Sequence, residues 1–225
     1  MRQEKIGYST LYLCDCMELM FTLPDKSIDL AIVDPPYGKG LHNMHGAKPK
    51  RGNDEVVRAV SWSAKYGGKI TKWDVAPEPE YFEELFRVSK YQIICGGNYF
   101  NLPPSRNFIV WRKHIPESFS MAMCEYLWTN IPGNAKFFKY PSCLEKGRFH
   151  PTQKPVALYK WLLSKYAKPG WKILDTHFGS GSIAVACNEM GFNLTACEID
   201  PDYFDSACER VREAAKQGDL FVGVA

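Results

Sequence analysis

The sequence contains no apolar run near the roughly 18 residues that a membrane-spanning helix needs, and its opening stretch MRQEKIGYSTLYL has no signal-peptide core. It has no internal repeat and no low-complexity segment. Neither sign of charge dominates, because 28 Lys and Arg residues stand against 25 Asp and Glu residues. These absences argue against a membrane partner and a uniformly basic chain, and they predict a cytoplasmic globular protein of 225 residues.

Zinc-ligand spacing is also absent. There are eight cysteines, but none forms a C-x-x-C pair and several lie inside apolar runs. A disulfide framework is not expected at this chain length. We interpret the cysteines as reduced thiols and expect no bound metal.

Short apolar runs alternate with helix-like segments along the chain. Strands are predicted at residues 10–15, 29–34, 91–97, 107–113, 124–130, 171–175 and 193–200. Helices are predicted between the first two strands and at residues 79–90, 156–167, 182–190 and 201–217. Strands separated by helices indicate an α/β fold with a mostly parallel, doubly wound sheet, in which strands 107–113 and 124–130 are antiparallel. One domain is expected over residues 1–225, with insertions at 38–76 and 131–149.

An acidic residue lies at the end of four of the predicted strands: Asp15, Asp34, Asp175 and Glu198. Ligands of parallel α/β sheets bind beyond the carboxyl ends of the strands. Four acids at that edge are hard to explain as four independent turn signals, so a binding site is expected there.

The stretch ILDTHFGSGS (173–182) combines a strand, an acid, a glycine turn and a helix start. Gly179 and Gly181 allow the backbone to approach a ligand closely. Glu198 follows about 20 residues after the turn, a spacing that suits ribose hydroxyls. The motif predicts a nucleoside cofactor without saying which one. A tight strand-to-helix turn and a nicotinamide site remain open at this point.

The stretch DPPYG (34–38) ends an apolar strand. Proline cannot donate to a strand ladder, so the motif could simply stop the strand. It could equally present the Asp34 carboxylate and the Pro35 carbonyl as two hydrogen-bond acceptors on a rigid backbone, beside the Tyr37 ring.

Five segments together resemble the amino-group DNA methyltransferases that use S-adenosylmethionine, in the circularly permuted order called the beta class. DPPYG is similar to the catalytic motif of that family. The other similar segments are LCDCMELM (13–20, near the cofactor adenine), HPTQKP (150–155), DTHFGSGS (175–182, the glycine loop) and CEIDPDYFDSACER (197–210, with the ribose-binding acid). The resemblance covers most of the chain and implies a Rossmann-like methyltransferase fold. Thr176 and His177, where many members have proline and phenylalanine, resemble phage and prophage members.

The resemblance implies direct methyl transfer to the exocyclic N6 of a flipped adenine, without a covalent intermediate. The implied catalytic residues are Asp34, Pro35, Pro36 and Tyr37. S-adenosyl-L-methionine is the implied cofactor, with Glu198 at its ribose and Lys154 at its methionine end. The full set of implied cofactor-binding residues is Asp15, Cys16, Asp34, Thr152, Gln153, Lys154, Asp175, His177, Phe178, Gly179, Ser180, Gly181, Ser182 and Glu198.

Double-stranded DNA is the expected partner, and contact with it requires a local basic surface. The candidate contacts are Lys39, Lys48, Lys50, Arg51, Arg58, Lys136, Lys139 and Arg148. The segment NAKFFKY (134–140) with Arg148 is either a short target-recognition element or a packed hairpin. We also predict a homodimer. Whether a restriction enzyme encoded elsewhere accompanies the protein, or whether it acts alone as in a phage, stays open.

Other functions compete with adenine-N6 methylation. Cytosine-N4 methylation is the nearest, although an aspartate at position 34 favours adenine. An RNA or protein methyltransferase, a catalytically inactive DNA-binding module and a nicotinamide enzyme are the more distant alternatives.

Overall fold

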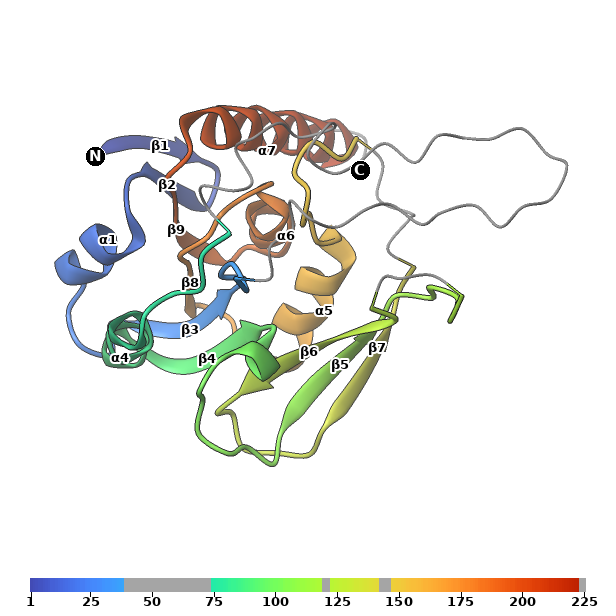
Figure 1. Cartoon of the computed structure of the whole chain (residues 1–225). Coiled ribbons are helices and arrows are strands. Elements are labelled where there is room, and N and C mark those ends of the chain that lie inside the picture. Colours follow the sequence, from blue (N-terminus) through green and yellow to red (C-terminus); the bar gives the residue numbers. More distant parts are fainter. Residues whose placement is uncertain (39–73, 119–121, 142–146, 223–225) are drawn as a thin grey trace, which may run out of the picture.

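The computed structural model describes residues 1–38, 74–118, 122–141 and 147–222 (Figure 1). Within them, nine strands form one sheet in the order β1-β2-β9-β8-β3-β4-β6-β5-β7. Their bounds, in that order, are Arg2–Ile6, Ser9–Leu13, Asn193–Glu198, Lys172–Asp175, Ile28–Val33, Ser89–Cys95, Cys124–Thr129, Phe108–Arg112 and Lys136–Lys139.

Five neighbouring strands at the centre of the sheet, β2, β9, β8, β3 and β4, run parallel. The flanking strands β1 and β6 are antiparallel to their neighbours, including the β5–β6 pair. The predicted α/β class, mostly parallel with antiparallel strands, is therefore confirmed.

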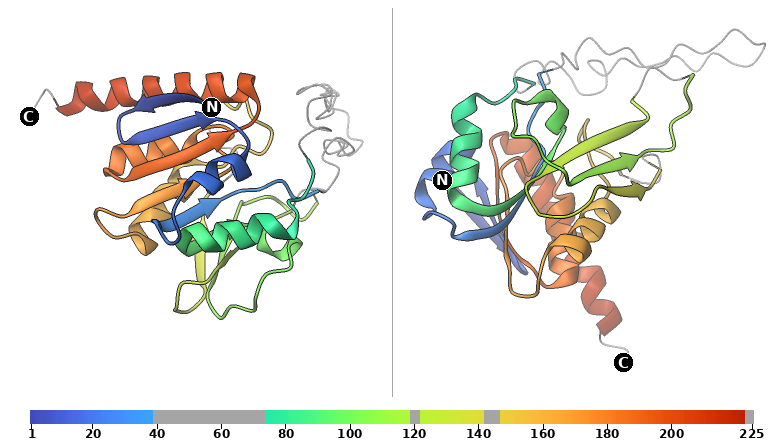
Figure 2. Two further views of the ribbon diagram at one scale, coloured as in Figure 1. Left: turned by 90° about the vertical axis from the view of Figure 1, so that its left-hand side faces the viewer. Right: turned by 90° about the horizontal axis from the view of Figure 1, so that it is seen from below.

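The helices cover both faces of this sheet (Figure 2). On one face lie α1 (Cys16–Thr22) and α4 (Pro79–Val88), and on the other lie α5 (Val156–Tyr166), α6 (Ser182–Met190) and α7 (Pro201–Val222). Strand β3 shows why two layers are needed. Its Leu30 and Ile32 pack into the core beneath α5 and α6, whereas Ala31 and Val33 pack beneath α1 and α4. Alternate side chains of one strand point to opposite faces, so an apolar run of this kind must be covered twice.

Two strands were not predicted. Strand β1 (RQEKI) buries only Ile6, and β7 (KFFK) exposes three of its four residues. Both are edge strands, and neither shows the apolar alternation that marks a strand in a sequence. The segment predicted as an insertion at 131–149 therefore contributes β7 to the sheet. Most of the other predicted insertion, residues 39–73, lies outside the described residues.

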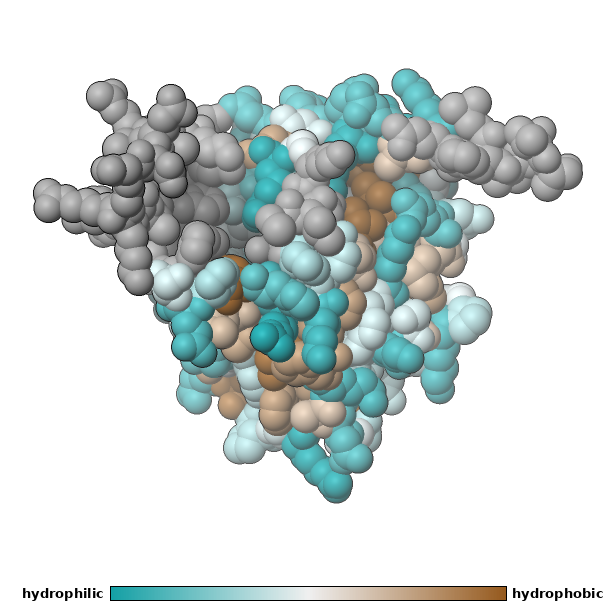
Figure 3. Space-filling model, turned by 90° about the vertical axis from the view of Figure 1, so that its right-hand side faces the viewer, coloured by the Kyte–Doolittle hydropathy of each residue, from teal (hydrophilic) through white to brown (hydrophobic). Residues whose placement is uncertain are grey.

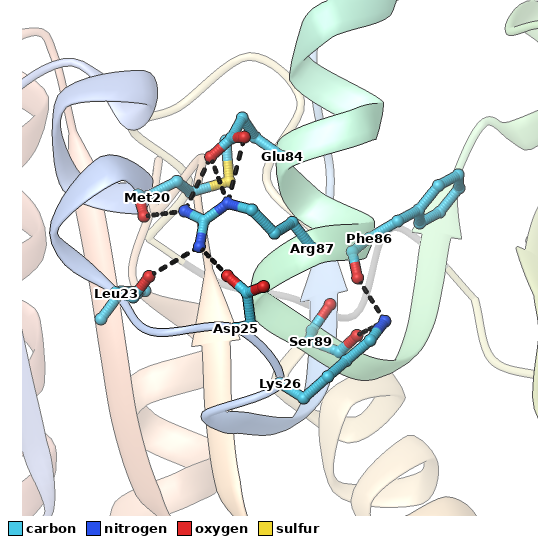
Figure 4. A network of polar contacts seen from close by, with 8 residues as sticks. All are labelled: Met20, Leu23, Asp25, Lys26, Glu84, Phe86, Arg87 and Ser89. Carbon is cyan, nitrogen blue, oxygen red and sulfur yellow. Dashed lines mark hydrogen bonds and ion pairs between the residues drawn. The ribbon is translucent and has the colours of Figure 1, made fainter.

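A guanidinium at the end of α4 fixes the chain that leads into β3 (Figure 4). Arg87 donates to the carbonyls of Met20 and Leu23, each over 3.0 Å, and forms ion pairs with Glu84 and Asp25. The end of α1 is thereby tied to α4. This contact helps to set where β3 starts and, six residues later, where Asp34 emerges.

No helix among the described residues has both the length and the apolarity to cross a membrane. Figure 3 shows the side of the molecule that β7 borders, where hydrophilic and hydrophobic areas are interspersed.

Candidate active site

The four predicted strand-end acids meet at one edge of the sheet, because β2, β9, β8 and β3 run parallel. A cavity of about 380 Å³ opens between the loops that follow these strands. It lies at the ends of the neighbouring strands β8 and β3. The chain continues from β8 to β9 on one side of this pair and from β3 to β4 on the other side. Ligands of such sheets usually bind at this position.

Most of the predicted site residues line this cavity. They are Asp15, Cys16, Asp34, Pro35, Pro36, Tyr37, Thr152, Gln153, Lys154, His177, Phe178, Gly179, Ser180 and Glu198. Three predicted cofactor residues do not line it: Asp175, Gly181 and Ser182. The structure thus brings segments 15–16, 34–37, 152–154 and 177–180 together around one space.

Gly179 and Gly181 have different roles in the turn. Both have positive φ, +51° and +74°. A Cβ on Gly179 would lie 3.6 Å from the His150 ring, beside the cavity, whereas a Cβ on Gly181 would lie 3.1 to 3.3 Å from Phe178, Val211 and Ala207. Gly181 therefore serves the packing of the turn against α7. Ser182 also faces away from the cavity.

The Ser182 hydroxyl links three parts of the site. It donates to the carbonyl of Lys154 over 2.7 Å and accepts from Arg210 Nη1 over 2.9 Å. Arg210 also donates to the carbonyl of Ser180 over 2.8 Å. Ser182 and Arg210 thus hold the glycine turn against the segment that precedes α5, which explains why a serine is needed at a position that does not face the cavity.

Glu198 is the best satisfied carboxylate of the site. Its oxygens accept the backbone N–H groups of Gly179 (2.8 Å), Ile199 and Asp200 (3.0 Å each). Burial raises the pKa of Glu198, and these three donors oppose that shift. A carboxylate has about four lone-pair positions, so the group is fixed in place with acceptor capacity left for a ligand hydroxyl.

Asp175 is buried behind the turn, and its Oδ1 accepts the backbone N–H of His177 over 2.9 Å. Burial raises the pKa of Asp175 to about 8. The neighbouring Thr176 hydroxyl lies 2.6 Å from Tyr81 Oη and 3.0 Å from His177 Nδ1. Burial lowers the pKa of His177 to about 4, so its ring is neutral near pH 7. Thr176 thus forms a hydrogen-bonded link between the glycine turn and Tyr81 of α4.

Asp34 has a partner on each oxygen. The Tyr37 hydroxyl donates to Oδ1 over 2.8 Å, and the Lys154 ammonium forms an ion pair with Oδ2. Lys154 Nζ lies 3.3 Å from Tyr37 Oη and 3.4 Å from Glu125 Oε2. Burial alone would lower the pKa of Lys154, but the Asp34 and Glu125 carboxylates outweigh it and raise that pKa. Lys154 is therefore a charged group beside the DPPY motif.

Glu125 of β6 was not predicted. It accepts from Lys113 Nζ over 2.5 Å as well as facing Lys154. Burial would raise the pKa of Glu125, but the two ammonium groups lower it to about 2. The sequence carries no local sign of this role, because Glu125 lies inside an ordinary strand pattern.

The Tyr37 ring is held in place by two neighbouring aromatic rings. It stacks on Tyr99 with 5.0 Å between ring centroids and 21° between planes, and it meets Phe100 edge-on at 6.1 Å. Gly96, after β4, has φ +67°, and a Cβ there would lie 2.3 Å from the Tyr37 ring. The stretch GGNYF (96–100) therefore fixes the aromatic ring of the DPPY motif.

Other residues line the cavity without having been assigned to it. They are Cys14, Val75, His150, Tyr159, Thr176, Ile199 and Tyr203. His150 begins the HPTQKP segment, and its ring packs edge-on against Tyr203 at 4.4 Å. Ile199 and Tyr203 directly follow Glu198 in sequence. Most of these residues belong to the predicted motifs. Val75 and Tyr159 lie outside every motif, so the sequence did not indicate them.

The predicted DNA contacts are placed only in part. Lys39, Lys48, Lys50, Arg51 and Arg58 lie outside the described residues. Lys136 and Lys139 are exposed on β7, and Phe137 between them is 51% exposed. Arg148 donates to the carbonyl of Gln153 over 3.0 Å, so its guanidinium is joined to the HPTQKP segment.

The segment around β7 is not a hairpin with β6, because β7 pairs in parallel with β5. Phe138 packs inward, 5.3 Å from Trp161 on α5 and 6.1 Å from Tyr140. Its neighbours Lys136, Phe137 and Lys139 stay at the surface. One residue of the strand thus anchors it while the others remain available to a partner.

Comparison with known proteins finds relatives among DNA methyltransferases. The N6/N4 family model described as DNA methylase matches residues 122–209. The chain is 27% identical over 269 residues to the type II methyltransferase M.HinfI of Haemophilus influenzae, covering 95% of this chain and 71% of that protein. It is 23% identical to the type II methyltransferase M.HpaI of Haemophilus parainfluenzae, covering 89% and 73% respectively.

Solved structures show the same fold. The M1.HpyAVI–SAM complex superposes with a TM-score of 0.55 at 20% identity, covering 90% of this chain and 99% of that one. The cytosine-N4-specific PvuII DNA methyltransferase superposes with a TM-score of 0.58 at 13% identity, covering 96% of each chain. The predicted resemblance is therefore confirmed: residues 122–209 match the N6/N4 DNA methylase model, and the chain as a whole is distantly homologous to type II methyltransferases.

Proposed function

We propose that this protein transfers a methyl group from S-adenosyl-L-methionine to the exocyclic N6 of adenine in double-stranded DNA. The observation that carries the proposal is the position of Asp34, Pro35 and Tyr37 on the same cavity as Gly179 and Glu198. An acceptor for an amino group and a cradle for a nucleoside thus face one another across one space.

The cradle fits the proposed cofactor. Glu198 would hold the ribose hydroxyls with its remaining lone pairs, and Gly179 would let the backbone lie close to the ligand. Asp15 and Cys16 would lie near the adenine ring, and Thr152 and Gln153 near the methionine end. When bound, S-adenosylmethionine supplies an electrophilic methyl group.

The chain's own residues would prepare the base. The lone pair of an exocyclic amino group is delocalised into the ring, which makes the nitrogen a poor nucleophile. Acceptance of its two N–H bonds by the Asp34 carboxylate and the Pro35 carbonyl would localise that lone pair on the nitrogen. Pro35 and Pro36 hold the two acceptors rigid, so little reorganisation is needed.

The Tyr37 ring would provide a stacking surface for a base taken out of the duplex. Its supports, Tyr99 and Gly96, fix the orientation of that surface. After transfer, the amino nitrogen releases one of its protons, and the Asp34 carboxylate is the nearest acceptor in this arrangement.

We propose that the exposed β7 residues Lys136, Phe137 and Lys139 contact DNA, and that the basic residues from Lys39 to Arg58 extend this contact. The proposal includes action in the cytoplasm of a bacterium or a phage-infected bacterium, and a homodimer, which light scattering over a concentration series would test. A restriction enzyme encoded elsewhere is a further proposed partner.

The test is a transfer assay with labelled S-adenosylmethionine and mixed-sequence duplex DNA, followed by digestion and mass spectrometry of the nucleosides. We expect label on N6-methyladenosine. Label on N4-methylcytosine would keep the chemistry and change the base, while label on RNA or protein alone would reject DNA as the substrate.

The role of Asp34 is tested by Asp34→Ala, with Asp202→Ala, an exposed position on α7, as the matched control. Loss of the carboxylate acceptor should lower transfer at least about 100-fold while cofactor binding, measured by calorimetry, persists. Wild-type transfer by Asp34→Ala would contradict the mechanism.

A further inference from the structure

Four charged groups of alternating sign follow one another beside the cavity: Lys113, Glu125, Lys154 and Asp34. Lys113 Nζ lies 2.5 Å from Glu125 Oε1, Lys154 Nζ lies 3.4 Å from Glu125 Oε2, and Lys154 is in ion-pair contact with Asp34. Their side chains are between 3% and 19% exposed. The charges of these four side chains add up to zero. A proton or an ammonium group can therefore shift among them without creating a buried net charge.

Asp34 is not free to receive an amino group in this arrangement. Tyr37 occupies Oδ1, and the Lys154 ammonium contacts Oδ2. An ammonium in that position withdraws electron density from the carboxylate and competes with an incoming N–H donor. Efficient use of Asp34 as an acceptor therefore needs Lys154 to move away from it.

Glu125 offers the place for Lys154 to go. Its Oε2 is buried and has no hydrogen-bond partner among the described residues, although Lys154 Nζ is only 3.4 Å away. A buried carboxylate oxygen without a hydrogen bond is costly. A displacement of Nζ by a fraction of an ångström toward Oε2 would complete that bond. Lys113 holds the other oxygen and keeps Glu125 in place.

We propose that Glu125 is a positioning residue: it takes over the Lys154 ammonium when the amino group of the target base engages Asp34. In the absence of a base, Lys154 neutralises Asp34 and Tyr37 closes the other oxygen. With a base bound, Lys154 turns to Glu125 and the full acceptor strength of Asp34 is directed at the amino group. This inference rests on the proposed function.

The experiment compares Glu125→Gln with the wild type, with Glu117→Gln, an exposed position, as the matched control. Single-turnover transfer is measured at saturating DNA and cofactor, together with calorimetry of cofactor binding. The glutamine keeps the shape but binds an ammonium weakly, so the transfer rate should fall at least about tenfold, with cofactor affinity changed less than about twofold and Glu117→Gln unchanged. Glu125→Asp, which retains the charge, should recover part of the rate.

The pH profile separates positioning from a structural role. Asp34 contacts Tyr37 and Lys154 directly, and it also interacts electrostatically with Glu125, Cys95, Tyr159 and Asp175. Removal of the Glu125 charge leaves Lys154 acting on Asp34 alone, so the acidic limb of kcat/KM should move to lower pH. An unshifted limb together with a wild-type rate would overturn the inference, whereas absence of transfer by the wild type itself would reject the proposed function.

A measurement on the wild type covers the case in which Glu125→Gln does not fold. The Lys154 Nζ signal is followed by NMR as S-adenosylhomocysteine and duplex DNA are added. The signal should shift only when both are present, because the ammonium changes carboxylate partners. A bound ternary complex with an unmoved Lys154 signal would also overturn the inference.

Discussion

Gly96 leaves the space that the Tyr37 ring occupies. An alanine there would combine left-handed backbone strain with a Cβ 2.3 Å from the ring, so the ring must shift. We expect Gly96→Ala to lower methyl transfer at least about tenfold and stability by about 1–3 kcal/mol.

Gly191 provides the matched control for this prediction. It also has a positive φ, +73°, but a Cβ there would meet nothing within 4 Å. Gly191→Ala should cost stability through backbone strain, about 1 kcal/mol, and leave transfer intact. Thermal melts and the transfer assay on both variants separate strain from displacement of Tyr37. Equal transfer by both variants would contradict the assigned role of Gly96.

Single residues were predictable where a motif lay at a strand end. The acids Asp34 and Glu198 stand out because each carboxylate comes at the end of an apolar run. Glu125 did not stand out, because its partners Lys113 and Lys154 reach it only through the pairing of β5 with β6 and the approach of the segment before α5. A contact made by tertiary structure leaves no spacing to find in the sequence.

Strand β7 is an edge strand that exposes three of its four side chains. Its exposed ammonium groups, Lys136 and Lys139, would neutralise DNA phosphates and release counterions. The double variant Lys136→Ala/Lys139→Ala should weaken DNA binding and make the slope of log affinity against log salt shallower by about 2. Fluorescence anisotropy over a salt series measures both quantities.

Two exposed lysines outside β7 give the control. Lys165, in the last turn of α5, and Lys168 are both exposed, and their double alanine variant should keep the wild-type slope. A wild-type slope in the β7 variant as well would remove β7 from the DNA contact.

The central strands β3, β4 and β8 were predicted to within two residues at each end, whereas the edge strands β1 and β7 were not predicted. Strands β3, β4 and β8 are apolar on both faces because helices cover both sides, and such runs are visible in any sequence. Edge strands β1 and β7 are held by backbone pairing and by one inward-packed side chain each, the buried Ile6 and the partly buried Phe138. Backbone hydrogen bonds are independent of side-chain type, so these strands carry no pattern.

For the whole molecule, two neutral histidines make the fold sensitive to acid. Burial lowers the pKa of His177 to about 4 and that of His150 to about 3, below the value of about 6.5 expected in an unfolded chain. Between pH 6.5 and 4 the unfolded state binds more protons, so stability falls as the pH is lowered.

When the pH is lowered from 7 to 5, the unfolding free energy of His177→Gln should fall less than that of the wild type. The expected difference is of the order of 1 kcal/mol. Urea titrations at the two pH values measure the difference. His114→Gln, at an exposed position, should follow the wild type. An identical pH dependence in His177→Gln would show that the ring is not held neutral.

The pairing of β2 with β9 joins residues 9–13 to residues 194–198. Asp15 and Cys16 therefore leave the ribosome long before Glu198, which lies at the end of the adjacent strand, is synthesised. The DPPY segment and the strands β3 and β4 are synthesised in the first half of the chain and can pair with each other early. The cradle needs loop closure across nearly the whole chain, which is slow. In a cell, each new molecule would thus hold a nearly finished acceptor site for the target base while it waits for the methyl-donor half to be synthesised.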